Sequence, residues 1–520
     1  MKIKRLKIFG QCRCLNDINI SFNIENKSPT ILLGENGAGK STLIEAILHI
    51  FMPFYSLNAV IEHDKDFDFD YDIEYGYASN DVLIEKRGNN FDLYLNGEEK
   101  AKRERILAFR PIIKQYLPMR IISFYSGANN RIEKLYSLVT KNYRKAYLNN
   151  IKTYLNFNAK KTSIDTPPDY YLPKRNFIYC HDDFSPVYLC AIMGGADSYE
   201  KKYLREKCQI ERINEVTVTL NTSKIKKALN KNVSVEEIQS IFDFLDNAFQ
   251  WKLVNPIEYK DDLYYTIKNI DTWGIDSVTI LDFFEKLQAV FDAKLDVEVV
   301  VKGKQVNCDY LSEGQRQLIK MLGMLGVCKS QDTLVLLDEP DAHMNPKWKY
   351  EIRGTIEKSL ESSINTQAII ATHDPLVMNG VDKEQVRIFS LNENGFSRII
   401  AATEDTVGLG IDGLLQSEYY GLRTSYDKKA TDKFFEQQTL YIKLINNEVN
   451  EEDKNRLKEL TREVGSMQMS YNSIDFLYDD FISVFRNMEL YRKEYLSYED
   501  VIERREKIQE IIRALYEGQV

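Results

Sequence analysis

The sequence predicts an α/β fold with a mixed sheet, a helical insertion lobe and a helical C-terminal tail. Three short apolar runs predict the sheet: residues 31–33 before a glycine-rich loop, 333–337 before two acidic residues, and 368–371 before Thr-His-Asp. Each run is long enough for a buried strand and too short for a typical buried helix. Between and beyond these runs apolar residues recur at helical spacing, which predicts the insertion and the tail.

Composition sets the broad class. The chain has 520 residues, a hydrophobic content of 43% and a formal net charge of −9. This length allows about three domains, and the acidic balance excludes a generic binder of polyanions. No apolar run approaches the ~18 residues that a membrane helix needs. Residues 1–7 are basic but lack the apolar segment of a signal peptide. We therefore expect a cytoplasmic protein without membrane contact.

The cysteines do not indicate a disulfide framework, because the seven of them are odd in number and scattered. Cys12 and Cys14 form C-x-C, and Cys180-His181 lies upstream of Cys190. Neither group has a second pair at matching spacing, so reduced core thiols are favoured over a zinc site.

The glycine-rich loop at residues 34–41 reads Gly-Glu-Asn-Gly-Ala-Gly-Lys-Ser and fits G-x-x-x-x-G-K-[ST] at every fixed position. Strand residues precede it and apolar residues at helical spacing follow it, which is the context of a phosphate site. Backbone N–H groups of such a loop turn toward an anion, and the helix start adds the positive end of its dipole. Lys40 is expected to reach the β- and γ-phosphates of a nucleotide, and the Ser41 hydroxyl to ligate Mg²⁺. The other expected contacts to the nucleotide are Gly34, Asn36, Gly37, Ala38, Gly39 and Thr42.

The segments around this loop are predicted to be strands, at residues 2–9 and 18–22 before it and as a hairpin at 82–86 and 91–95 after it. Residues 64–74 alternate acidic with aromatic or apolar side chains, which is typical of a strand with two different faces. The aspartates at 64, 66, 68, 70 and 72 suggest either a metal site or a solvated edge that resists aggregation, and the edge is favoured.

Residues 100–180 reverse the overall charge, with seventeen Lys and Arg against four acidic residues. Tyrosines are interleaved at 136, 143, 147, 154, 170 and 171. Basic charge with aromatic stacking surfaces is what a nucleic-acid groove needs. The alternative is a solvated helical face whose charges pair with acids elsewhere. Farther on, strands are predicted at 215–220 and 297–301, and amphipathic helices at 234–251 and 279–293.

A second group of motifs follows residue 310. Ser312, Gly314 and Gln315 lie in Leu-Ser-Glu-Gly-Gln at the start of a predicted helix, which suits an anion. Asp338 at a strand end can hold Mg²⁺ through water, and the adjacent Glu339 can polarise an attacking water. After the next strand, His373 can touch a γ-phosphate as a sensor. Each motif alone is weak, but their order behind the glycine-rich loop makes coincidence improbable.

Together these motifs resemble those of the ABC-type ATPases. The resemblance implies ATP and Mg²⁺ as ligands and a homo-oligomer built on head-to-tail dimers. In such a dimer Lys40 of one subunit faces the Ser312 and Gly314 signature of the other across ATP, and Glu339 is the general base. Asn345 stands where many ABC proteins have an aspartate that contacts the other subunit, and residues 123–127 stand in place of a Q-loop.

The spacing between the loop and the signature is similar to that of the compact prokaryotic branch near the overcoming-lysogenisation-defect ATPases. The segment after His373 lacks the carboxylates of the TOPRIM nuclease that usually follows in that branch. Overall size and tail resemble the PtuA family, the ATPases of Septu and retron-linked antiphage systems, whose partner is an HNH nuclease. We expect four parts: residues 1–122 with the phosphate loop, an insertion at 123–300, the remaining ATPase motifs at 301–401, and a helical region at 402–520 for a partner or for self-association. Ser497 and Asp500 predict a capping box in that last part.

Three functions stay open on this basis. The leading one is an ATP-hydrolysing switch in antiviral defence that controls a partner nuclease, with nucleic acid as a trigger. The second is a scaffold that holds ATP with little turnover, and the third is a DNA-repair or SMC-like ATPase that acts alone. The chain has five histidines, of which only His373 lies in a recognisable site. We therefore expect any cutting of nucleic acid to come from a second protein.

Overall fold

The computed structural model describes residues 1–22, 29–55, 65–126, 131–159, 176–180, 185–245, 256–270, 275–327, 332–361, 366–422, 427–445 and 450–466. The chain forms two compact units, Met1–Tyr420 and Gly421–Val520, and each is described by itself. The first unit therefore extends past residue 401, where the sequence suggested that the tail begins.

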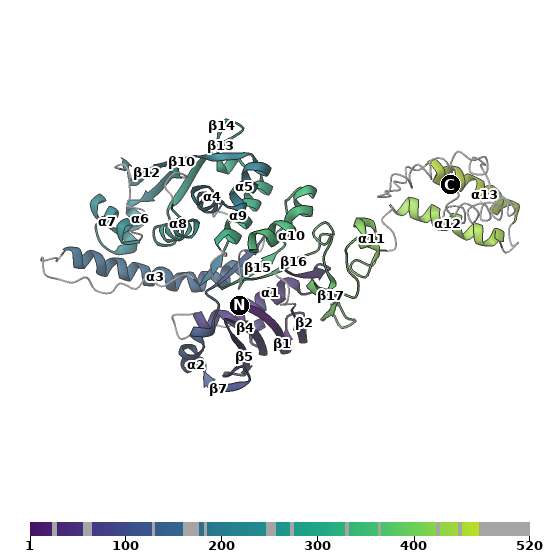
Figure 1. The fold of residues 1–520 in the computed structure, drawn as a ribbon, viewed down its shortest axis with the longest axis horizontal. Coiled ribbons are helices and arrows are strands. Elements are labelled where there is room, and N and C mark those ends of the chain that lie inside the picture. The colour runs from purple at the N-terminus through teal and green to yellow at the C-terminus, as the bar shows by residue number, and fades with distance from the viewer. Residues whose placement is uncertain are drawn as a thin grey trace, which may run out of the picture. The chain divides into compact units, whose positions relative to one another are not determined.

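A seven-stranded sheet forms the centre of the first unit, where Figure 1 labels its strands β15, β16 and β17. The strands have the order β18-β17-β3-β16-β15-β8-β9. Only β18 is antiparallel to its neighbour; the other pairs are parallel, so the sheet is mixed as predicted. The central strands are buried along their length, which explains why their sequences are continuous apolar runs. The strands are β3 (Thr30–Gly34), β8 (Arg120–Tyr125), β9 (Phe177–Tyr179), β15 (Thr333–Asp338), β16 (Gln367–Thr372), β17 (Val386–Leu391) and β18 (Ser397–Ala401).

A second, six-stranded antiparallel sheet has the order β2-β1-β4-β5-β6-β7. Helix α1 (Lys40–Tyr55) contacts β3 and β15 of the central sheet, and its Phe51 and Phe54 rings pack against Tyr75 and Phe91 of the second sheet. Because both sides of this helix are covered, nearly all of its residues are buried. The strands are β1 (Lys2–Cys12), β2 (Leu15–Ser21), β4 (Asp70–Tyr77), β5 (Asn80–Arg87), β6 (Asn90–Leu95) and β7 (Glu98–Arg105), with α2 (Ile106–Ile113) following.

The insertion contains a sheet as well as the expected helices. Its five antiparallel strands have the order β11-β12-β10-β13-β14, and both strands predicted in this region belong to it. The strands are β10 (Ile210–Asn221), β11 (Ile257–Tyr259), β12 (Asp262–Lys268), β13 (Lys294–Val301) and β14 (Lys304–Asn307). The helices are α3 (Arg131–Ala159), α4 (Ser185–Gly194), α5 (Tyr199–Tyr203), the π-helix η4 (Leu204–Cys208), α6 (Thr222–Leu229), α7 (Val235–Leu245) and α8 (Ser277–Phe291).

The insertion and the ATPase motifs share one core. Helix α4 packs on α9 (Glu313–Val327), which carries the signature, and there a side chain on Gly323 would collide with the ring of Tyr188. The expected boundary at residue 122 falls inside β8, because this strand and β9 complete the central sheet on the far side of β15.

The remaining described α-helices are α10 (Pro346–Leu360) and α11 (Gly410–Gln416) in the first unit, and α12 (Lys428–Ile445) and α13 (Glu451–Ser466) in the second. Helices α12 and α13 pack together through Leu440, Leu444, Leu457 and Leu460, which confirms an amphipathic pair in the tail. The predicted capping box at residues 497–500 and the end of the helix predicted at 234–251 lie outside the described residues. None of the helices that the structure describes is long and apolar enough to cross a membrane.

Candidate nucleotide site

Three parallel strands bring the predicted catalytic residues to one edge of the central sheet. Strand β16 lies between β3 and β15, with Leu33 paired to Thr372 and Asp338 paired to Ala371. The glycine-rich loop follows β3, Glu339 follows β15 and His373 follows β16, so all three leave the sheet at the carboxyl ends of adjacent strands. Ligands of open α/β sheets bind at that edge.

The glycine-rich loop has the backbone that its sequence requires. Gly34, Gly37 and Gly39 have φ of 151°, 84° and 103°, conformations that residues with a side chain rarely adopt. The loop ends at α1, whose first residue Lys40 donates from Nζ to the carbonyl oxygens of Gly34 and Glu35 at 2.6 and 3.0 Å. Burial lowers the pKa of Lys40, and the neighbouring carboxylates of Glu339 and Asp338 partly offset that effect.

Two segments distant in sequence support this loop. The Ser397 hydroxyl at the start of β18 donates to the Ala38 carbonyl at 2.7 Å, and the Ser397 backbone N–H donates to the Cys14 carbonyl. The Cys14 thiol in turn contacts the Thr42 hydroxyl at 3.6 Å. A side chain on Gly39 would lie 2.4 Å from the Ser397 hydroxyl, so this glycine is required by its neighbour as well as by its φ. Sequence reasoning missed the support that Ser397 and Cys14 give to this loop, since Ser397 lies in no motif and Cys14 was considered only as part of the C-x-C pair.

Asp338 is suited to hold a cation. Its side chain is fully buried, and neither carboxylate oxygen has a hydrogen-bond partner within normal geometry. Burial raises the pKa of Asp338 to about 7, although the nearby Ser41 hydroxyl lowers it in part. A buried carboxylate without partners is costly unless an ion or a proton compensates it. The residues present therefore fit Mg²⁺, with Ser41 and Asp338 as the groups that would hold it and the β- and γ-phosphates as the groups it would neutralise.

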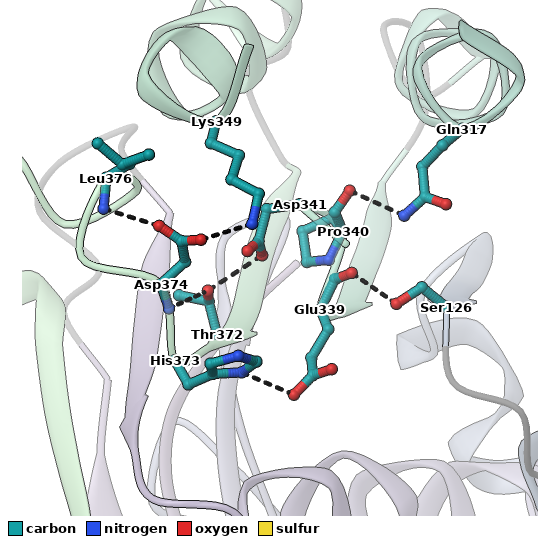
Figure 2. A network of polar contacts seen from close by, with 10 residues as sticks. All are labelled: Ser126, Gln317, Glu339, Pro340, Asp341, Lys349, Thr372, His373, Asp374 and Leu376. Atoms are coloured by element: carbon teal, nitrogen blue, oxygen red, sulfur yellow. Dashed lines mark hydrogen bonds and ion pairs between the residues drawn. The ribbon is translucent and has the colours of Figure 1, made fainter. Parts of the chain in front are cut away.

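Glu339 and His373 face each other at this edge (Figure 2). The Nδ1 atom of His373 lies 3.0 Å from Oε1 of Glu339, and both side chains are partly exposed. An ionised carboxylate only accepts hydrogen bonds, so in a pair with ionised Glu339 the donor would be His373 Nδ1. Glu339 has φ of +50°, a conformation that is strained for a residue with a side chain, and Ser126 holds its carbonyl with a hydrogen bond of 2.7 Å.

Polar contacts also surround His373 on both sides in the chain (Figure 2). The preceding Thr372 donates its hydroxyl to Asp341 at 3.0 Å and accepts the Asp374 backbone N–H at 3.1 Å. The following Asp374 accepts from the Leu376 N–H at 2.9 Å and pairs with Lys349 Nζ on α10 at 2.6 Å. These contacts hold the chain on both sides of His373.

The signature starts α9 through a reciprocal cap. The Gln315 N–H donates to the Ser312 hydroxyl at 3.3 Å, while the Gln315 side-chain oxygen accepts the Ser312 N–H at 3.0 Å. A side chain on Gly314 would meet the His343 carbonyl at 3.0 Å, so the signature packs against the turn after β15. One turn farther along α9, Gln317 donates to the Pro340 carbonyl at 3.1 Å (Figure 2).

Asn345, the departure from the ABC pattern, has a structural role within the chain. Its side-chain oxygen caps α10 by accepting the Trp348 N–H at 3.0 Å. An aspartate could make the same cap, so the asparagine preserves the start of α10 while removing one negative charge. The segment at 123–127, proposed to stand in place of a Q-loop, is described as far as Ser126, which contacts Glu339; residue 127 lies outside the described part.

The basic stretch differs from a groove for stacked bases. Tyr136, Tyr143 and Tyr147 on α3 are buried at 2–3% exposure, so these rings contribute to the core and cannot stack on bases. That part of the interpretation is wrong, because alternation of basic and aromatic residues also arises on a helix with one buried and one solvated face. Arg144 pairs with Asp292 at 3.6 Å and Arg120 with Asp282 at 3.0 Å. Residues 160–175 of the stretch lie outside the described part.

The acidic strand is not the solvated edge that was favoured for it, because β4 pairs with β1 on one side and with β5 on the other. Tyr71, Ile73 and Tyr75 point into the core from β4, which starts at Asp70 rather than at 64. Asp68 and Asp72 pair with the basic residues Lys86 and Arg87 of β5. Cys12, Cys180 and Cys190 are buried cysteines that form no disulfide, and the described residues contain no group of three or more His, Cys, Asp or Glu placed to hold a metal.

A family model described as "AAA domain, putative AbiEii toxin, Type IV TA system" matches residues 30–379. The match begins at the strand before the glycine-rich loop and extends beyond His373, so it includes the whole edge described above. The chain belongs to this family and is a P-loop ATPase.

Among curated proteins the chain is similar to a Septu protein and to two probable ATPases of retrons. It is 22% identical over 515 residues to Septu protein PtuA of Bacillus mycoides (strain KBAB4), covering 95% of this chain and 55% of that protein. It is also 22% identical over 417 residues to Retron Vc95 probable ATPase of Vibrio cholerae serotype O1 biovar El Tor, covering 75% of this chain and 74% of that protein. Retron Ec83 probable ATPase of Escherichia coli is 22% identical over 388 residues, with 69% and 66% covered. The chain thus spans about half the length of the PtuA relative.

Among solved structures, two heads of SMC proteins match the chain with low TM-scores. The SMC head domain from Thermotoga maritima has a TM-score of 0.32 at 13% identity, covering 78% of this chain and 100% of that one. An SmcHead bound to the C-winged helix domain of ScpA has a TM-score of 0.36 at 15% identity, covering 78% and 98%.

Proposed function

We propose that this chain is the ATP-hydrolysing regulatory subunit of a prokaryotic antiviral defence system. The observation that carries the catalytic part is the meeting of Lys40, Asp338, Glu339 and His373 at the carboxyl edge of three adjacent strands. Lys40 and the loop N–H groups would bind the phosphates, and Mg²⁺ held by Ser41 and Asp338 would neutralise charge that develops on them. Glu339 would accept the proton of the attacking water, and its hydrogen bond from His373 would keep its carboxylate oriented.

The defence role rests on similarity along nearly the whole chain to Septu protein PtuA, together with similarity to two retron ATPases. Two copies would assemble head to tail, so that the Ser312 signature of one completes the phosphate site of the other. The position of the signature at the start of α9 supports this arrangement, because the positive end of a helix dipole suits an anion.

The cutting function would belong to a separate HNH nuclease. The described residues show no cluster of metal ligands that could serve a nuclease centre. The tail beyond residue 421 forms its own compact unit, which supports a docking role for the nuclease or for further copies of this chain. Nucleic acid would act as the trigger, sensed through the solvated basic face of α3 rather than through its buried tyrosines.

The test is to purify the native protein from its source and to identify what co-purifies with it. A nuclease should accompany the full chain and be lost when residues 430–520 are deleted. DNA and RNA should stay intact with the purified chain, Mg²⁺ and ATP, and be cut when the partner is added. Robust cutting by the isolated chain, with Lys40→Ala as a contamination control, would overturn the division of labour.

Two other functions give different results in the same experiments. A scaffold that holds ATP would bind nucleotide but show no turnover in the wild type. A repair or SMC-like ATPase would hydrolyse ATP and bind DNA without any co-purifying nuclease. A reading frame for an HNH nuclease or a reverse transcriptase beside the gene would favour the defence role over both.

A further inference from the structure

Helix α10 makes polar contacts in two opposite directions. Lys349 reaches Asp374 beside the catalytic edge, whereas Glu351 reaches Tyr203 and Lys207 in the insertion. Residues two apart on an α-helix are separated by about 200° around its axis, so these two side chains leave opposite faces. The helix therefore lies between the insertion and the segment that carries His373.

The contact with the insertion converges on one carboxylate. The Tyr203 hydroxyl donates to Oε2 of Glu351 at 3.0 Å, and Lys207 Nζ lies 2.8 Å from the same carboxylate. Burial alone would raise the pKa of Glu351, but the hydrogen bonds from Lys207 and Tyr203 lower it below its usual value. Lys358, two turns farther along α10, lies 6.0 Å over the ring of Tyr199 on the same short segment. The contact is thus specific and extends along the helix.

The partner segment in the insertion is unusual and well placed. Tyr203 ends α5, and Lys207 lies in the π-helix η4, a form that is rare and frequently found at functional sites. The next residues lead directly into β10, the strand that pairs with both β12 and β13 of the five-stranded sheet. A displacement of that sheet would therefore act on η4 and, through it, on Glu351.

On its other side, α10 contacts the edge of the central sheet directly, through Lys349 and the residue that follows His373 (Figure 2). The Lys349 ammonium holds Oδ2 of Asp374, while Oδ1 of Asp374 accepts the Leu376 N–H. The Asp374 side chain is 14% exposed, so its ion pair is largely shielded from water. The Asp374 backbone N–H also donates to the hydroxyl of Thr372, two residues earlier. The position of Asp374 therefore sets the turn that contains His373.

We propose that Glu351 and Lys349 are positioning residues through which the insertion controls where His373 lies relative to Glu339. The inference rests on the proposed ATP-hydrolysing function and adds regulation to it: an event sensed on the insertion changes the rate of hydrolysis through α10. Neither residue touches the glycine-rich loop in the described contacts, so the phosphate cradle at Lys40 and Ser41 stays intact when this link is broken. If this contact served only for packing, breaking it would change stability but would not lower kcat while leaving KM for ATP nearly unchanged.

The test is a charge swap across the contact, with ATP turnover as the first readout. Lys207→Glu and Glu351→Lys each place like charges together and should lower kcat about tenfold while KM for ATP changes less than about twofold. The double variant restores an opposite pair and should recover kcat to within about threefold of wild type. Glu351→Gln, which keeps a hydrogen-bond acceptor for Tyr203, is a milder variant if a charge reversal does not fold. Glu357→Gln is the matched control, because it breaks the 2.8 Å pair with Arg353 within α10 and leaves both outward contacts in place.

A second readout separates this inference from the proposed function. The imidazole ¹⁵N signals of histidine-labelled protein, with His373 assigned by its loss in His373→Ala, should shift in Glu351→Gln and not in Glu357→Gln. If wild-type protein hydrolyses no ATP, the proposed function fails, while the His373 signal still tests the link. An unshifted His373 signal overturns the inference. So does a kcat unchanged by both reversals, or a loss that the double variant does not recover.

Discussion

Replacing Glu339 by glutamine removes a proton acceptor and almost nothing else. In the wild type His373 Nδ1 lies 3.0 Å from the Glu339 carboxylate, and a glutamine side-chain oxygen can still accept a hydrogen bond from it. The contacts of residue 339 with Ala371 and Ser126 use its backbone and do not involve the side chain. A positioned general base contributes about 10²–10⁴-fold to a rate. We therefore expect Glu339→Gln to lower kcat at least about 100-fold, which corresponds to ~2.7 kcal/mol of transition-state stabilisation.

Binding of ATP should be unaffected by this change, because the groups proposed to hold the phosphates and the metal are Lys40, Ser41 and Asp338, and none of them is residue 339. The assay is single-turnover hydrolysis of ATP alongside calorimetric binding of Mg²⁺-ATP. Glu393→Gln, in the exposed turn between β17 and β18, is the control for loss of a carboxylate elsewhere. Hydrolysis by Glu339→Gln within about threefold of wild type would refute a general-base role, since no proton acceptor of comparable strength would then be needed.

Four further predictions follow from the same edge and its surroundings. Lys40→Ala should abolish ATP binding in a folded protein, because the ammonium is the phosphate contact of the loop; unchanged affinity would disprove the assignment. Burial raises the pKa of Asp338 to about 7, so the native protein binds a proton at this carboxylate more tightly than the unfolded chain does. The free energy of unfolding should therefore fall as pH rises from about 4 to 7. Measured in EDTA at pH 8, Asp338→Asn should therefore raise Tm by a few degrees, and a lowered Tm would contradict the cost of the buried charge. Measured with Mg²⁺, the same variant should lose turnover of ATP. Ser397→Ala removes the hydroxyl that holds the Ala38 carbonyl and should weaken ATP binding about five- to tenfold, as expected for one hydrogen bond of ~1 kcal/mol, whereas Thr403→Ala, beyond β18, should not. Any nucleic-acid binding should decrease steeply with salt, and reversing Arg144, Lys145, Lys160 and Lys161 to glutamate should remove it without affecting ATP affinity; salt-independent binding would return the basic stretch to a solvated surface.

Much of the fold could be predicted because its signals are local. The buried strands β3, β15 and β16 are continuous apolar runs, and the hairpin of β5 and β6 alternates along its length with a glycine-containing turn. These patterns depend on neighbours within a few residues, so tertiary context rarely changes them. Strand β18 and the edge strand β14 were not predicted, since short strands at a sheet edge carry little apolar periodicity.

The basic stretch shows where local pattern misleads. Lysines, arginines and tyrosines alternate through α3 in the same way for a binding surface and for a half-buried helix. Whether Tyr136, Tyr143 and Tyr147 face solvent depends on which elements pack on α3, and that is decided by contacts with segments such as β9. No count of charges in the sequence contains this information.

The sequence by itself determined the phosphate loop, the strand-end carboxylates and the histidine, because each depends on a short contiguous motif whose residue types are required by chemistry. Only the tertiary structure decided what supports them. Ser397 reaches Ala38 from 359 positions away, and Lys207 reaches Glu351 from 144 positions away. Contacts at such separations form only when a shared core places the elements side by side, and a single sequence records the two partners without recording that they meet.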